Sequence, residues 1–189
     1  MTRASRKSAV SRSALVGALL VLTACGGSKG HDGAIPESLC DVKVEPDLVK
    51  PLLPTGKKFH YFDSGDGKEN RLCQLYVGGE KVFDIDNTRS LVKRDAMTYA
   101  HMSLYGLENT ERAAIGDDGV LADNGAYIVN SCTYQGKKMS YVLYIHVSQT
   151  KEDYYEGLYA GKHLKLRPEV LRFAKAYLPG GAKVMGCAT

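Results

Sequence analysis

The fold is decided by the stretch Ala126-Tyr-Ile-Val-Asn-Ser-Cys-Thr-Tyr-Gln-Gly-Lys-Lys-Met-Ser-Tyr-Val-Leu-Tyr-Ile-His-Val147. Two runs rich in tyrosine, valine and isoleucine flank the dipeptide Gln135-Gly136. β-Branched and aromatic residues favour strands, and a two-residue connection containing glycine suits the tight turn of a hairpin. The stretch therefore predicts an antiparallel β-hairpin.

With Gln135-Gly136 as the turn, the two strands present faces of different character, because side chains alternate along a strand. One face carries the pairs Cys132 with Met139, Asn130 with Tyr141, Ile128 with Leu143, and Ala126 with Ile145. The opposite face carries Ser131 with Ser140, Val129 with Val142, and Tyr127 with Tyr144. One face of a half-buried antiparallel pair is normally the more apolar. We expect the first face, which includes Cys132, to be covered by other elements.

Two helical patterns follow the hairpin. The first opens with a capping-box spacing at Thr150 and carries apolar residues at helical spacing as far as Tyr159. The second is expected to begin at Pro168 and to end at Leu178-Pro-Gly-Gly181. The short tail after it brings Cys187 back toward the sheet.

The first half of the chain carries weaker signals. In chain order they predict a short helix over 47–53 ended by Pro54, a hairpin of 71–77 and 80–86 around Gly78-Gly79, a helix rather than a strand over 90–105, and a strand over 112–121 with a turn at 117–119. Strands mixed with segregated helices are typical of an α+β domain. We therefore expect a mainly antiparallel sheet with helices packed on one face.

Four cysteines lie beyond residue 36, at positions 40, 73, 132 and 187. An even number in an exported chain predicts two disulfides, although three connectivities are possible. We favour Cys40–Cys73 and Cys132–Cys187, because the hairpin register places Cys132 on the covered face and the C-terminal tail returns there. A four-thiolate zinc site is the alternative, but the chain has no Cys-x-x-Cys spacing, and we expect no metal.

The N-terminus has the pattern of an exported, lipid-modified protein. A basic stretch ending at Arg12 precedes the apolar run Ala14–Leu22, which is too short to span a bilayer and fits a secretory signal. Leu22-Thr-Ala-Cys25 resembles the bacterial lipobox, whose cysteine receives a diacylglyceryl group; the alternative is an ordinary signal peptide with a chance cysteine. Two acyl chains hold a protein stably on a membrane. The expected divisions are a signal peptide over 1–24, a flexible tether over 25–35 and a single globular domain over 36–189.

The charge of the expected mature chain is balanced. The whole chain has 25 basic and 21 acidic residues, and four of the basic ones lie in the first 24 residues, which leaves 21 against 21. Nucleic-acid binding normally requires a basic face. We therefore expect no nucleic-acid partner.

The chain carries no strong catalytic signature. It has no Gly-x-Ser-x-Gly, no His-Glu-x-x-His and no phosphate-binding glycine loop. The run Asp63–Glu69 gathers carboxylates near two glycines, as calcium loops do, but it lacks the ligand spacing of an EF-hand and reads better as a surface turn. The sequence therefore identifies no catalytic residue, and we expect no metal and no cofactor.

A candidate binding surface lies on the less apolar face of the hairpin. It consists of Tyr127, Tyr144 and His146, since tyrosine rings with polar tips suit recognition surfaces. The alternative is that a helix or the first hairpin covers this face, and that His146 is a packed strand residue.

The chain resembles the small cysteine-containing lipoproteins of actinobacteria whose function is uncharacterised. The matching features are Leu-Thr-Ala-Cys25-Gly-Gly, the Leu39-Cys40 opening with the downstream Cys73, and Ala113–Gly119 leading into Ala126–Cys132. The resemblance implies a location in the cell envelope and transfers no catalytic residue.

The sequence thus favours a lipoprotein anchored to the outer face of a membrane. Its expected role is that of a non-enzymatic module that binds an envelope protein or a small ligand. The alternatives are an envelope-associated, hydrolase-like enzyme whose site is assembled across the fold, and a structural or assembly factor of the envelope.

Overall fold

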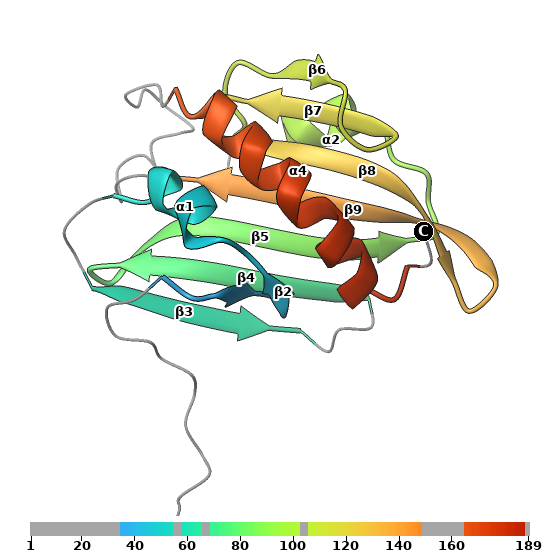
Figure 1. Ribbon diagram of the computed structural model, residues 1–189. Helices are drawn as coiled ribbons and strands as arrows, with labels where there is room; N and C mark the ends of the chain where they lie inside the picture. Colours follow the sequence, from blue (N-terminus) through green and yellow to red (C-terminus); the bar gives the residue numbers. More distant parts are fainter. Residues whose placement is uncertain (1–34, 55–57, 66–68, 103–105, 149–164, 188–189) are drawn as a thin grey trace, which may run out of the picture.

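The computed structural model describes residues 35–54, 58–65, 69–102, 106–148 and 165–187. Within these ranges one antiparallel sheet of seven strands has the order β3-β4-β5-β9-β8-β7-β6 (Figure 1). Its strands are β3 (Phe59–Ser64), β4 (Asn70–Val77), β5 (Glu80–Ser90), β6 (Glu111–Ala113), β7 (Asp118–Ala122), β8 (Gly125–Tyr134) and β9 (Lys137–Val147). Other elements cover both faces of this sheet. Apolar side chains from each face are therefore buried in a core.

The central strands β8 and β9 form the predicted hairpin in the predicted register. Cys132 pairs with Met139 and Ile128 pairs with Leu143. The turn residue Gln135 has a φ of 50° and Gly136 a φ of 76°, the left-handed backbone that a tight hairpin turn requires. The local pattern of residues 126–147 is therefore sufficient to determine this pairing.

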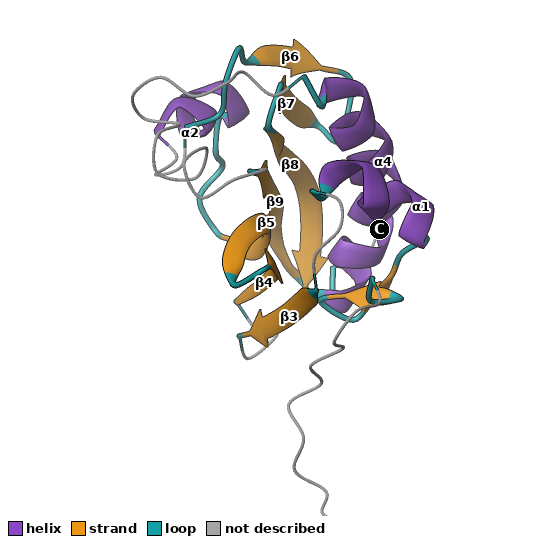
Figure 2. Cartoon of the chain, turned by 90° about the vertical axis from the view of Figure 1, so that its left-hand side faces the viewer, coloured by secondary structure: helices purple, strands orange, loops and turns teal. Residues whose placement is uncertain are grey.

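Helices cover both faces of the sheet, as Figure 2 shows. The long helix α4 (Arg167–Val184) crosses one face, beside α1 (Pro46–Val49), the 3₁₀ turn η1 (Lys50–Leu52) and the small hairpin of β1 (Ser38–Leu39) and β2 (Val42–Lys43). The short helix α2 (Ala96–Met102) packs on the opposite face against β7 and β8. The α+β class and the antiparallel sheet are confirmed, with α2 as an addition on the second face.

Both predicted disulfides are present. Cys40–Cys73 joins the turn of the β1–β2 hairpin to β4, and Cys132–Cys187 joins β8 to the tail after α4. They close loops with sequence separations of 33 and 55 residues. In the chain-entropy account, each stabilises the fold by roughly 4 kcal/mol. The two bridges thus tie both ends of the domain to the sheet.

The predicted end of the last helix is wrong. The sequence Leu178-Pro-Gly-Gly181 does not stop α4, which continues through Pro179 to Val184. The glycines instead let the helix approach its neighbours closely. A Cβ on Gly181 would lie 2.1 Å from Tyr141 Oη of the large sheet, and one on Gly180 would lie 2.5 Å from a methyl carbon of Val42 in the β1–β2 hairpin. Close packing therefore outweighs the local helix-breaking tendency of this segment.

Hydrogen bonds join α4 to the sheet at this point of close approach. The Tyr141 hydroxyl donates to Asn87 Oδ1 at 2.6 Å, and Asn87 Nδ2 donates to the Tyr177 hydroxyl at 3.1 Å. Tyr141 and Tyr177 have no exposed surface, and burial raises the pKa of the Tyr141 hydroxyl well above its usual value. These polar groups satisfy one another inside an otherwise apolar layer.

Three further expectations need correction or lie outside the described ranges. The segment after β5 begins as a loop rather than a helix, because β5 extends to Ser90 and α2 starts only at Ala96. The turn expected at 117–119 lies earlier, since Asp118 and Gly119 already pair with β8. The helix expected from Thr150 to Tyr159 lies outside the described residues.

We expect Gly181→Ala to destabilise the domain by about 1–3 kcal/mol, because overpacking of a tight interface has that cost. The new methyl group would meet the Tyr141 hydroxyl first. Tyr141→Phe should therefore be less costly in the Gly181→Ala background than in the wild type. Urea unfolding of the four proteins of this double-mutant cycle measures the coupling, and strictly additive losses would contradict the proposed contact.

Candidate functional site

A cleft of about 740 Å³ opens at one end of the sheet. Four segments meet there: the loop after β5, the start of β7, the end of β8 and the start of β9 (Figure 1). Ligand sites commonly occupy volumes of about 300–1,000 Å³. Its lining residues are Leu91, Lys93, Arg94, Asp95, Asp117, Asp118, Val129, Asn130, Ser131, Lys138, Met139 and Ser140.

The loop that forms one wall of the cleft is fixed at both ends. At its start, the Val92 amide donates to Ser90 Oγ at 3.2 Å. At its end, Asp95 Oδ1 accepts hydrogen bonds from the amide and the hydroxyl of Thr98, which is the usual way in which an aspartate begins a helix. Hydrogen bonds thus hold both ends of this loop between β5 and α2.

An arginine and two aspartates connect this loop to the neighbouring strands. Arg112 on β6 forms ion pairs with both Asp95 and Asp118. Asp118 Oδ2 also accepts a hydrogen bond from the Ala96 amide at 2.8 Å. The start of α2 is thus tied to the edge of the sheet by charge-assisted hydrogen bonds, which are stronger than neutral ones.

The third aspartate of the cleft is held by β8. Asp117 Oδ2 accepts hydrogen bonds from both the amide and the hydroxyl of Ser131. These bonds, together with the nearby charge of Lys93, lower the pKa of Asp117. Hydrogen bonds from Thr98 and Arg112 lower the pKa of Asp95 to about 2. Both carboxylates are therefore ionised and weakly basic at neutral pH, which makes them poor general acids or bases.

The basic side chains of the cleft are less engaged. Arg94 lies over the Tyr99 ring at 4.5 Å and makes one long hydrogen bond, of 3.4 Å, to the Tyr127 hydroxyl. Its Nε is buried without a hydrogen-bond partner. Lys93 and Lys138 are exposed, and neither they nor Arg94 forms an ion pair with another described residue. The cleft therefore presents cationic groups that can bind an anionic group of another molecule.

The binding surface expected from the sequence, Tyr127, Tyr144 and His146, is largely interior. The three residues do lie together, with ring-centre distances of 6.3 Å between Tyr127 and Tyr144 and 6.4 Å between Tyr144 and His146. However, Tyr99 of α2 stacks on Tyr127, which is only 6% exposed, and His146 is 1% exposed. The alternative of a covered face therefore describes Tyr127 and His146 better than an open recognition surface does.

A buried polar cluster lies beside His146 on the same face. Asp84 accepts a hydrogen bond of 2.7 Å from Gln74 Nε2, and its other oxygen lies 2.9 Å from Lys81 Nζ as an ion pair without hydrogen-bond geometry. His146 Nδ1 is 3.9 Å from that oxygen, too far for a hydrogen bond. Gln74 and Lys81 thus compensate Asp84, and His146 and Asp84 are not in the direct contact that an acid–base pair uses.

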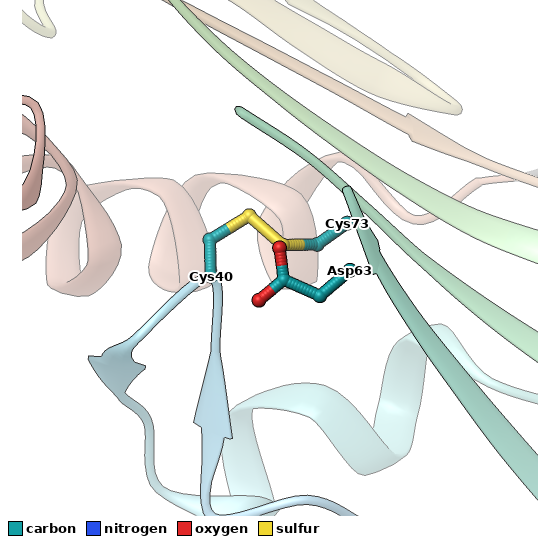
Figure 3. Close-up of side chains that lie close together, drawn as sticks. All are labelled: Cys40, Asp63 and Cys73. Atoms are coloured by element: carbon teal, nitrogen blue, oxygen red, sulfur yellow. A yellow bond between two sulfur atoms is a disulfide. The ribbon is translucent and has the colours of Figure 1, made fainter. Parts of the chain in front are cut away.

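Two sulfur atoms and a carboxylate lie close together at Cys40, Cys73 and Asp63, as Figure 3 shows. The two cysteines are joined in a disulfide, so neither offers the thiolate that binds a metal. Asp63 instead forms a two-point ion pair with Arg71, which also contacts Asp41. The cluster is thus a disulfide beside an ion pair, in which both carboxylate oxygens of Asp63 accept hydrogen bonds from Arg71.

The residues of the cleft were not recognised from the sequence. The sequence pattern places Asp117 and Asp118 in a turn, and Lys93 and Arg94 in the segment 90–105, for which it predicts a helix. No motif or spacing in the sequence connects these residues, because they belong to predicted segments that are separated along the chain.

Comparison with known proteins does not assign the chain to a class. No family model, curated protein or solved structure matches it. Within the described residues no helix is both long and apolar enough to cross a membrane. The resemblance to actinobacterial lipoproteins therefore stays a prediction from the sequence.

We expect Arg112→Gln to raise the pKa of Asp95 from about 2 toward the ordinary value of 3.8, although the Thr98 hydrogen bonds will keep part of the shift. Because the folded pKa of Asp95 is the lower one, its contribution to stability is present above about pH 4 and is lost as the pH falls toward 2. A carbon-detected NMR titration of the carboxyl group measures the change. Arg172→Gln on α4 is the matched control, and equal titration of Asp95 in both variants would refute the ion pair.

Proposed function

We propose that the mature protein is held on the outer face of a membrane by acyl chains on Cys25 and acts there as a non-enzymatic binding module. The binding site is the cleft at the end of the sheet. The observation that carries this proposal is a cleft built from four segments, whose three basic lining residues Lys93, Arg94 and Lys138 have no ion-pair partner among the described residues.

The support for the anchor comes from the N-terminal sequence. A basic start, a short apolar run and Leu22-Thr-Ala-Cys25 occur in the order that a lipoprotein signal requires. The two disulfides are consistent with an oxidising compartment outside the cytoplasm. The described domain begins at Ile35, so the chain between it and Cys25 is short. A tether of about ten residues with this glycine-rich composition spans on the order of 15–20 Å.

Binding is favoured over catalysis by the chemistry of the cleft. Each of its three carboxylates already accepts hydrogen bonds from amides, hydroxyls or Arg112. The pKa values of Asp95 and Asp117 are lowered, whereas a catalytic acid at neutral pH needs a raised one. Asp95 and Asp117 therefore do not suit the role of proton donor that the hydrolase-like alternative requires.

Cys25→Ala should abolish incorporation of labelled fatty acid and should release the domain from the membrane or leave an unprocessed precursor. The reason is that alanine has no sulfur atom to which the diacylglyceryl group could be attached. Metabolic labelling followed by membrane fractionation measures both effects, with Ser28→Ala as the neighbouring control. Undiminished labelling of the Cys25→Ala protein would defeat the assignment.

A photo-crosslinking side chain introduced at Lys138, in the cleft, should give specific adducts in intact cells. The same side chain at Lys175, exposed on α4 away from the cleft, should not give them. Mass spectrometry of the two sets of adducts makes the comparison. Absence of adducts at position 138, or the same adducts at both positions, would count against the cleft as the binding site.

A further inference from the structure

We propose that the cleft takes an acidic segment of a partner polypeptide in which a carboxylate side chain lies next to an apolar one. This inference rests on the binding role proposed for the cleft and names the chemistry of its ligand. Three features of the described residues support it: unpaired cations within the cleft, carboxylates that are already compensated, and an exposed apolar pair at its rim.

The cations provide the attraction for a carboxylate. Lys93 and Lys138 come from different segments, the loop after β5 and the start of β9, so an acidic group entering the cleft can meet both. Arg94 belongs to the same loop as Lys93, and its guanidinium lies over the Tyr99 ring and makes one long hydrogen bond to Tyr127. Lysine and arginine side chains form charge-assisted hydrogen bonds with carboxylates that are about twice as strong as neutral ones.

The acidic residues of the cleft favour a ligand that carries a single negative group over a continuous anionic surface. Asp95, Asp117 and Asp118 line the same cleft and keep their negative charge, although hydrogen bonds and Arg112 compensate them. A uniformly anionic bilayer or polyanion would be repelled by these three groups as it approached the cations. A polypeptide that brings one carboxylate to Lys93 or Lys138 carries less negative charge past these three groups, so this repulsion is smaller.

The rim supplies the apolar contact. Leu91 is 72% exposed and the adjacent Val92 is 64% exposed, although the loop that carries them is fixed by Ser90 and Asp95. Exposed apolar surface can mark an interaction site when it adjoins a polar cleft, as this pair does. A ligand confined to the cleft would leave Val92, which does not line it, in water. A polypeptide segment that enters the cleft and continues over the rim can cover both side chains.

Selection from a random peptide library on the immobilised mature chain tests this inference. We expect enriched peptides to combine Asp or Glu with a neighbouring apolar residue. Binding of the best peptide, measured by fluorescence anisotropy, should weaken about tenfold or more in the double variant Lys93→Glu/Lys138→Glu, because each favourable charge contact becomes a repulsive one. Leu91→Ser/Val92→Ser should also weaken it without lowering Tm.

The matched control is Lys43→Glu/Lys175→Glu, which makes the same charge change on exposed lysines of β2 and α4. It should leave peptide binding unchanged. Enrichment of basic or uncharged peptides, equal loss in both double variants, failure to enrich any peptide, or binding only to vesicles of anionic lipid would each overturn the inference. None of these results would affect adducts formed at position 138 in cells, so failure of the ligand class is distinguishable from failure of the binding role.

Discussion

The close approach of α4 to the centre of the sheet is the contact on which the rest of the structure depends. Gly181 leaves just enough room for the hydroxyl of Tyr141, which together with Asn87 and Tyr177 forms a buried chain of hydrogen bonds between helix and sheet. A larger residue at position 181 would push the helix outward and weaken these hydrogen bonds between buried groups. Cys132–Cys187 then secures the tail that follows the helix.

This contact determines which parts of the sheet remain available for binding. Because α4, α1 and the β1–β2 hairpin occupy one face, and α2 with Tyr99 covers part of the other, the described cleft lies at the end of the sheet. Its wall depends on ion pairs between Arg112 and two aspartates, which join α2 to the edge of the sheet. Interactions that stabilise the fold thus also position the basic groups to which we assign binding.

The sequence predicts the parts of this fold that depend on local pattern. A Gln-Gly turn between alternating strands determines the β8–β9 register, and that register places Cys132 where Cys187 can reach it. The extension of α4 through Pro179 could not be predicted in this way, because it depends on contacts with residues more than thirty positions away in the chain. The cleft is missed for the same reason: its lining comes from separate segments, each of which looks like an ordinary loop or turn by itself.

The central claim is that this lipid-anchored domain binds its partner through the cleft at the end of the sheet. Hydrogen–deuterium exchange of the protein in its native membrane, compared with the same protein purified away from its partners, tests this claim most directly. The account predicts slower exchange in the native membrane for residues 91–95, 117–118 and 129–140 and no change along α4. Protection confined to α4 or to the edge strand β3, with unchanged exchange around the cleft, would contradict it.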